Sequence, residues 1–195
     1  MEHIDDDRRG ETPSRHVLAN PDVKSLTLLR HAKSSWTDQG LADSERPLSK
    51  RGLRDAPGMG ERLVQRGLKP DLILSSPATR AHQTAEYIAA GFESSGIEIR
   101  LEPSIYLASP GQLLKTLSNV SDAIDTLVLI GHNPGLTQLA NMMLSDLALS
   151  NLPTAGAVAI DCDMESWRNI ESERFSLRFY DYPKNAAPPL RRVDR

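Results

Sequence analysis

The sequence contains one cysteine, Cys162, among its 195 residues. A single cysteine cannot form a disulfide within the chain, and it argues against a cysteine-based zinc site. Histidines could in principle ligate zinc instead, but the sequence contains no HxxxH pair to support such a site. We therefore expect a protein that uses no metal ion and no other cofactor.

Long apolar stretches are also missing. No run approaches the roughly 20 residues that a membrane-spanning helix needs, and the first residues lack the apolar segment of a secretion signal. The net charge is only −3, which argues against a dedicated nucleic-acid-binding protein. We therefore expect neither a membrane nor a nucleic acid as partner, and a cytoplasmic location by default.

The composition suits one globular domain, because 39% of the 195 residues are hydrophobic and a chain of this length can bury a sizeable core. We place the domain at residues 23–183. Residues 1–22 hold six acids and three arginines without an apolar period, which is typical of a disordered leader. Residues 184–195 form a basic tail with four bases and one acid. A solvated terminus is the simplest interpretation of that tail, and contact with RNA or an acidic partner is the alternative.

Strand and helix patterns alternate along the domain. Apolar strand patterns occupy residues 25–31, 71–76, 97–102 and 126–132, and helical patterns occupy 48–67, 77–92, 109–119 and 133–145. Two further strand patterns, 156–163 and 174–182, close the chain without a helix of comparable length between them. This order predicts an α/β fold, a three-layer α/β/α sandwich on a mostly parallel central sheet, with an antiparallel C-terminal element.

Local signals indicate where several helices begin. Ser49 and Asn133 suit N-cap positions, and Pro77 suits the first position of its helix. Pro57 interrupts the first helical pattern, which predicts a kink or a late start. Two of the predicted helices therefore begin directly after apolar strands.

Polar and charged residues gather where three of the predicted strands end. The first strand ends in Arg30 and His31, the second leads into Arg80 at a helix start, and the fourth ends in His132 and Asn133. In open α/β sheets, ligands bind outside the carboxyl ends of the strands. If the sheet is parallel, two arginines, two histidines and two helix N-termini converge on one cleft.

Such a set suits a phosphoryl group. Arginine donors match phosphate oxygens, helix N-termini favour anions, and a neutral imidazole can attack phosphorus. Each residue also has a plainer explanation: Arg30 could pair with a surface carboxylate, and His31 could be a satisfied core histidine. Their joint placement at strand ends favours a catalytic site.

Three blocks of the sequence, "LLRHAKSSW", "LILSSPATRAHQTAE" and "VLIGHNPGL", together resemble the histidine phosphatase superfamily, which has the phosphoglycerate mutase-like fold. "RHAKSSW", "RPLSKRGLRDA" and "GHNPGL" further resemble the SixA-type phosphohistidine phosphatases, which lack the large inserted cap of other branches. Ala32 stands where the superfamily signature has glycine, as is usual in this branch. The resemblance covers about residues 24 to 183.

The resemblance implies a role for each residue of these blocks. His31 would be the nucleophile, Arg30 and Arg80 would bind the phosphoryl oxygens, and His132 would donate to the group and orient it. Ser34 corresponds to a position where many members place a phosphate-contacting hydroxyl. Asn133 would contribute through its backbone, although helix capping is its simpler interpretation.

The general acid of the superfamily has no clear counterpart. The corresponding slot holds Leu107, and Glu102 lies too early in the sequence. Asp38, Asp43 and Glu45 follow the first strand, but solvated loop acids are their simplest interpretation. Protonation of an alkoxide leaving group typically accelerates its departure about 10²- to 10⁴-fold, whereas imidazole can leave already protonated. A missing acid therefore favours a phosphohistidine substrate over an alkyl phosphate.

The leading hypothesis is a metal-independent phosphatase that hydrolyses phosphohistidine on proteins through a covalent phosphohistidine intermediate. A compact chain without a lid insertion leaves the cleft open to a macromolecule. The alternative is a small phosphate ester or anhydride hydrolysed by the same mechanism. Mutase activity and a non-catalytic phosphate-binding module are weaker hypotheses, since no lid is evident to exclude water and all four central residues are present.

Overall fold

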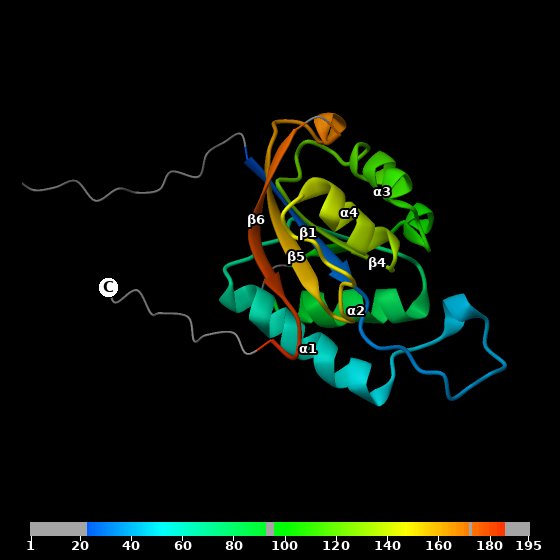
Figure 1. The fold of residues 1–195 in the computed structure, drawn as a ribbon. Helices are drawn as coiled ribbons and strands as arrows, with labels where there is room; N and C mark the ends of the chain where they lie inside the picture. Colours follow the sequence, from blue (N-terminus) through cyan, green and yellow to red (C-terminus); the bar gives the residue numbers. More distant parts are fainter. Residues whose placement is uncertain (1–22, 93–95, 172, 186–195) are drawn as a thin grey trace, which may run out of the picture.

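The computed structural model describes residues 23–92, 96–171 and 173–185, and these form three layers (Figure 1). A six-stranded sheet is the middle layer, with helices on both of its faces. The predicted three-layer α/β/α sandwich is therefore confirmed. The predicted leader, residues 1–22, lies outside the described residues, as does the predicted tail from residue 186 onward.

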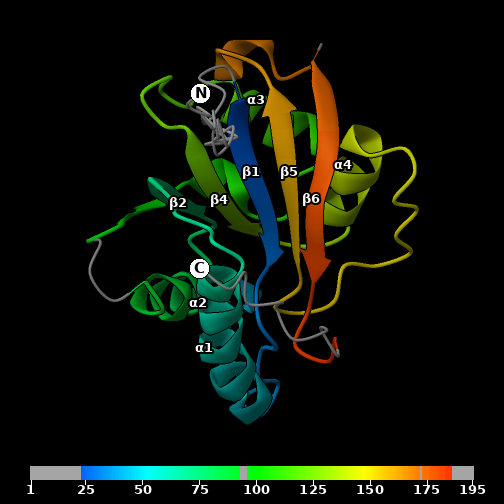
Figure 2. The ribbon, with the colours of Figure 1, turned by 90° about the vertical axis from the view of Figure 1, so that its left-hand side faces the viewer.

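The sheet is parallel on one side and antiparallel on the other. Its strands are β1 (Val23–Arg30), β2 (Leu72–Ser75), β3 (Glu98–Leu101), β4 (Thr126–Gly131), β5 (Ala157–Asp163) and β6 (Arg174–Asp181). Their order is β3-β2-β4-β1-β5-β6. β1 to β4 run parallel to one another, whereas β5 is antiparallel to both β1 and β6. Figure 2 shows β1, β5 and β6 side by side. The predicted antiparallel C-terminal element is therefore confirmed.

Within the described residues, α-helices cover both faces of the sheet (Figure 1). They are α1 (Lys50–Gln65), α2 (Thr79–Ala90), α3 (Pro110–Leu117) and α4 (Gly135–Met143). α1 and α2 share one apolar cluster with the sheet, and α3 and α4 share another on the opposite face. Three short 3-10 helices, η1 (Asp43–Glu45), η2 (Pro103–Ile105) and η3 (Trp167–Asn169), lie in the connections.

The central strand β4 is apolar because both of its faces are buried. Leu127 and Leu129 belong to the cluster beneath α3 and α4, while Val128 and Ile130 belong to the cluster beneath α1 and α2. Side chains alternate between the faces of a strand, so a strand covered on both faces needs apolar residues at every position. The buried strands therefore fix the positions of the residues that directly follow them.

The helix starts agree with the sequence in one case and correct it in three. The Ser49 side chain accepts from the Gly52 N–H and caps α1, as predicted. The sequence left two outcomes open at Pro57, a kink or a late start. α1 begins at Lys50 and runs through Pro57, so the late start is wrong. α2 begins at Thr79, two residues after Pro77, so the proline precedes the helix instead of occupying its first position.

Asn133 is not the cap of α4. That helix begins at Gly135 with Pro134 in the N-cap position, and no side chain caps it. The Asn133 amide donates instead to the Leu152 carbonyl at 3.0 Å and to the Asn151 Oδ1 at 2.8 Å. The capping prediction is therefore wrong, because a loop distant in sequence competes successfully for the side chain.

Two glycines allow close packing around the ends of β1 and β4. A Cβ on Gly52, in α1, would overlap the carbonyl oxygen of Lys33. A Cβ on Gly135, at the start of α4, would overlap the carbonyl oxygen of Ala108. Glycine is needed at both positions because only hydrogen fits there.

Within the described residues, no helix is both long enough and apolar enough to cross a membrane.

Candidate active site

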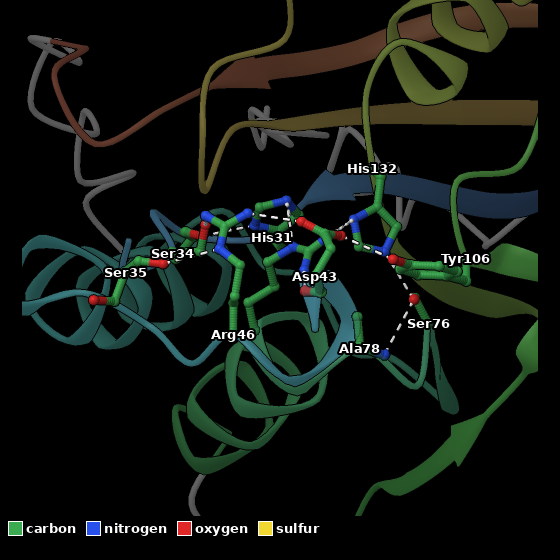
Figure 3. Close-up of polar contacts among 11 residues, drawn as sticks. His31, Ser34, Ser35, Asp43, Arg46, Ser76, Ala78, Tyr106 and His132 are labelled. Atoms are coloured by element: carbon green, nitrogen blue, oxygen red, sulfur yellow. Dashed lines mark hydrogen bonds and ion pairs between the residues drawn. The ribbon is translucent and has the colours of Figure 1, made fainter. Parts of the chain in front are cut away.

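β1, β2 and β4 end at one edge of the sheet, and each is followed by a polar residue of the site. The N–H of His31 donates to the Gly131 carbonyl at 3.1 Å, and the N–H of Ser76 donates to the Ile130 carbonyl at 3.0 Å. These bonds continue the strand pairing beyond the strands. His31, Ser76 and His132 therefore lie close together, as Figure 3 shows.

The ring of His31 is held in a single neutral tautomer. Only 8% of the residue is exposed. Its Nδ1 lies 2.7 Å from the carbonyl oxygen of Ala32. A carbonyl can only accept, so the proton of the neutral ring resides on Nδ1. The lone pair of Nε2 accepts from the Nε of Arg80 at 3.3 Å. The nitrogen suited to attack phosphorus thus faces a guanidinium group.

Arg80 lies between the two histidines. It belongs to the first turn of α2 and is only 4% exposed. While its Nε faces His31, its Nη2 lies 3.4 Å from the Nδ1 of His132. The two imidazole centroids are 5.0 Å apart. One edge of the guanidinium therefore presents one donor to each ring, in a geometry that can also receive two oxygens of a phosphoryl group.

His132 is oriented through its other nitrogen. Because Nδ1 accepts from Arg80, the proton of the neutral ring resides on Nε2. That Nε2 lies 2.8 Å from the hydroxyl oxygen of Ser76, which also accepts from the N–H of Ala78 at 3.3 Å. The Tyr106 ring packs nearly perpendicular to the imidazole at a centroid distance of 5.4 Å. Ser76 and Tyr106 together fix the direction in which Nδ1 points.

Asp43 holds the outer side of Arg80. Its Oδ2 accepts from the Nη2 of Arg80 at 2.8 Å and from the Tyr106 hydroxyl at 2.8 Å. Its Oδ1 accepts from the Nη1 of Arg46 at 2.7 Å, and its backbone carbonyl accepts from the Nη1 of Arg80. Asp43 is exposed, as expected of a loop acid, but its carboxylate is also bound by Arg80, Arg46 and Tyr106, which the sequence did not predict. The loop after β1 folds back over the start of α2, which a purely local interpretation of the sequence does not reveal.

Arg46 ties this loop to Ser34. Its Nη2 donates to the Ser34 hydroxyl at 2.7 Å, and its Nε donates to the Ser35 carbonyl at 3.0 Å (Figure 3). The guanidinium also lies 3.2 Å from the centroid of the exposed Trp36 ring. The Ser34 hydroxyl, predicted to contact phosphate, thus accepts a hydrogen bond from Arg46 and helps to position the loop that carries Asp43.

Both catalytic candidates are kept neutral by their surroundings. Burial lowers the pKa of His31 to about 3, and the charges of Arg80 and Arg30 add to this effect. Burial also lowers the pKa of His132 to about 4, again assisted by Arg80. Burial alone would raise the pKa of Asp43, but hydrogen bonds from Tyr106, Arg80 and Arg46 outweigh it and lower that pKa to about 2. At neutral pH the site therefore contains two neutral imidazoles and one carboxylate.

Arg30 and Asn133 lie beside this centre and hold a neighbouring loop. The Nη1 of Arg30 donates to the Leu152 carbonyl at 2.8 Å and lies 3.4 Å from the Asn151 Oδ1. Asn133 donates to the same two oxygens. The buried Nε of Arg30 has no hydrogen-bond partner among the residues described. The structure therefore brings the Arg30 charge close to the histidines, but within the described residues its guanidinium makes no hydrogen bond to either ring.

The other candidate acids form local hydrogen bonds. The carboxylates of Asp38, Glu45 and Glu102 accept from the N–H groups of Gly40, Ala42 and Ser104. The side chain at the expected acid position, Leu107, is exposed. Asp43 is therefore the candidate acid that reaches the site. Across the described ranges, no group of three or more His, Cys, Asp or Glu side chains is arranged to hold a metal ion.

Arg46, Tyr106 and Ser76 belong to the site, and none of them was singled out in the sequence. Arg46 belongs to the conspicuous "RPLSKRGLRDA" block, so it could have been singled out. Tyr106 immediately precedes Leu107, and nothing in its local pattern marks it. Arg46 and Tyr106 contact the Asp43 carboxylate, and these contacts form only when the loop after β1 folds over α2.

The fold and the site together define a class of protein. An α/β/α sandwich with a buried arginine and two neutral imidazoles at the carboxyl ends of parallel strands has donors suited to a phosphoryl group. The chain belongs to the histidine phosphatase superfamily: the sequence profile of its branch 1 matches residues 26–106, which include Arg30, His31 and Arg80. Membership of this superfamily supports phosphatase activity on this fold.

Individual relatives are similar over most of the chain. An uncharacterised chloroplast protein of Arabidopsis thaliana is 37% identical over 164 residues, which are 79% of this chain and 72% of that protein. An uncharacterised protein of Mycobacterium tuberculosis is 32% identical over 165 residues, which are 80% of this chain and all of that protein. A SixA protein of Agrobacterium tumefaciens, assigned as a phosphohistidine phosphatase, is 28% identical with a TM-score of 0.71. That match covers 82% of this chain and 98% of the SixA chain.

Proposed function

We propose that the protein is a metal-independent phosphatase that hydrolyses phosphohistidine on proteins through a covalent intermediate on His31. The observation that carries this proposal is the buried, neutral imidazole of His31, whose Nε2 lone pair faces Arg80. A nucleophile must present a lone pair, and a cationic partner must be in place where negative charge accumulates. Both requirements are met at this one nitrogen.

The reaction proceeds in two transfers. The Nε2 of His31 attacks phosphorus in line with the leaving nitrogen, a bond from phosphorus to Nε2 forms, and the bond to the substrate imidazole breaks. Water then attacks the same phosphorus from the opposite side, the bond to Nε2 breaks, and inorganic phosphate leaves. The proton lost by the water passes to phosphate or solvent, so His31 returns to its starting tautomer.

Arg80 stabilises the charge on the transferred group in both steps. Its Nε and Nη2 already face the Nε2 of His31 and the Nδ1 of His132, so they can exchange these ring nitrogens for two phosphoryl oxygens with little movement. His132 can take up a proton on Nδ1 as the anion arrives, because a nearby negative charge raises the pKa of an imidazole. It then becomes a further donor. Arg30 supplies positive charge from the side of β1.

Asp43 is poorly suited to act as a general acid. Its pKa of about 2 and its hydrogen bonds from Arg80, Tyr106 and Arg46 keep it ionised at neutral pH. Leu107 occupies the expected position of the acid and cannot donate a proton. A leaving group that departs without a proton donor is therefore favoured, and imidazole meets that condition better than an alkoxide does. The likeness to the SixA protein of Agrobacterium tumefaciens supports the same substrate class.

The test uses two peptides of one sequence, carrying phosphohistidine in the first and phosphoserine in the second at the same position. We expect kcat/KM for the phosphohistidine peptide to be higher by at least about 10²-fold, the lower end of what a general acid contributes. Phosphate release is measured for wild type and for His31→Ala, which reports contaminating phosphatases. Equal turnover of both peptides would contradict the proposal. Strong competition by small phosphate esters would favour the small-molecule alternative.

A further inference from the structure

A cleft lies beside Arg30, on the side of β1 that carries β5 and β6. It has a volume of about 390 Å³ and is built by four segments of the chain: the exit of β1, the first turns of α1, residues 151–154 and the residues after β6. Its charged lining consists of four cations and one acid, namely Arg30, Lys33, Arg51, Lys184 and Asp55. Arg30 is shared with the candidate active site.

The cleft is strongly cationic although the whole chain carries a net charge of −3. Its one acid, Asp55, is engaged by Arg54 at 2.9 Å and by Arg51 at 3.6 Å. Lys33 and Lys184 form no ion pair with any other residue that the structure describes. Uncompensated cations concentrated in one cleft raise the local concentration of anionic ligands. The cleft is thus suited to receive negative charge.

The walls of the cleft are fixed by contacts outside it. The buried Asp181, at the end of β6, accepts from the Nε of Arg62 at 3.1 Å and from the Nε of Arg66 at 2.7 Å. These bonds hold the segment that carries Lys184 against α1. On the opposite wall, the Nη2 of Arg51 donates to the Thr154 hydroxyl at 2.9 Å. A preformed wall reduces the ordering cost of binding.

The cleft is also close to the nucleophile along the chain. Lys33 follows His31 by two residues, and two residues of extended chain span at most about 7 Å. A peptide whose phosphohistidine reaches the Nε2 of His31 could therefore place a side chain one or two positions away in the cleft. The charge of that side chain would have to be negative.

We propose that this cleft is a second anion-binding subsite, which takes carboxylate side chains flanking the phosphohistidine of a protein substrate. The proposal rests on the proposed function and adds a sequence preference to it: acidic residues within two positions of the modified histidine. Arg30 links the two sites, because it lines the cleft and its charge acts on both histidines. The lysines supply most of the discrimination, since they have no partner to displace among the described residues.

The test measures binding without turnover. A fluorescent peptide carries an unphosphorylated histidine with two glutamates on each side, and its partner carries glutamines at those four positions. Fluorescence anisotropy at low ionic strength gives Kd for each. We expect wild type to bind the glutamate peptide about five- to tenfold more tightly, as two exposed charge pairs allow. The ratio should fall to about one in Lys33→Ala/Lys184→Ala. The matched control, Lys69→Ala/Lys115→Ala, removes the same charge elsewhere and should retain the preference.

Each result decides the proposal. Equal affinity of wild type for the two peptides, or an unchanged preference in Lys33→Ala/Lys184→Ala, would overturn it. An equal loss in the control variant would also overturn it, because net charge alone would then explain the effect. The phosphorylated peptides are assayed separately. A glutamate preference in binding without hydrolysis of phosphohistidine would retain the subsite and contradict the proposed function instead.

Discussion

The centre of the site and the cleft beside it place their cations in opposite settings. Arg80 is 4% exposed and contacts both imidazoles and the Asp43 carboxylate, so its direction is set before any ligand arrives. Lys184, in the cleft, is exposed and has no ion-pair partner within the described residues. Buried, fully partnered charges act strongly on groups at fixed positions, whereas exposed charges are screened and act weakly. The centre is therefore suited to catalysis, and the cleft to selecting what approaches it.

This comparison is tested most sharply by weakening separately the arginine of the centre, Arg80, and the arginine that lines the cleft, Arg30. Arg80→Lys removes the two-pronged contact to the histidines, so we expect kcat/KM to fall about 10²- to 10³-fold, as for the loss of one oriented donor. Arg30→Lys should cost about tenfold, because the Arg30 guanidinium contacts the loop at Leu152 instead of either ring. Steady-state kinetics on a phosphohistidine peptide measures both. A greater loss of kcat/KM from Arg30→Lys would contradict this order, because the contacts in the ligand-free structure would then not indicate which arginine matters more for catalysis.

The next prediction concerns stability against pH. Burial lowers the pKa of His31 to about 3 and that of His132 to about 4. In the unfolded chain both titrate near 6.5. Between about pH 6.5 and pH 4 the unfolded state therefore binds more protons, and the free energy of unfolding decreases as the pH falls. The decrease approaches about 1.4 kcal/mol per pH unit for each histidine.

Denaturant unfolding at pH 7, 6 and 5 measures this dependence. We expect His31→Asn to reduce the slope of stability against pH by about half, because one of the two depressed groups is gone. Lys115→Ala, in the last turn of α3, removes a charge that contacts neither histidine and should retain the full slope. An unchanged slope in His31→Asn would mean that this imidazole is not held neutral by burial.

A smaller effect is expected from Asp43→Asn. The amide keeps the size of the side chain but loses the charge that holds Arg80 and Arg46, so we expect kcat/KM to fall about tenfold for every substrate. A general acid would behave differently, since its loss costs about 10²- to 10⁴-fold and falls mainly on poor leaving groups. Comparing phosphohistidine, aryl and alkyl phosphates therefore separates the two roles. A loss confined to the alkyl ester would make Asp43 the proton donor.

Sequence patterns were informative for the polar residues that directly follow a strand or begin a helix. Arg30, His31, Arg80 and His132 could be expected at one edge because each follows an apolar strand or begins the next helix, and parallel strands align their ends. That rule depends only on local pattern and on the direction of the strands. It placed the central residues correctly without any knowledge of loop conformation.

The sequence failed where a loop decides the outcome. Asp43 resembles any exposed loop acid, and its contact with Arg80 joins residues 37 positions apart. Asn133 has the local signature of a helix cap, but its side-chain amide donates hydrogen bonds to the loop at residues 151–152 instead. Such contacts depend on how irregular segments fold back onto the sheet, and no period in the sequence records this.

The central claim is that the Nε2 of His31 carries the phosphoryl group during turnover. It is tested most directly by rapid quenching after mixing ¹⁵N-histidine-labelled protein with phosphoramidate, followed by NMR of the ³¹P–¹⁵N pair. We predict an acid-labile, base-stable phosphate bound to the Nε2 of His31 in wild type, and none in His31→Ala. Phosphate bound to His132, or labelling of His31→Ala to the same extent as wild type, would contradict the account.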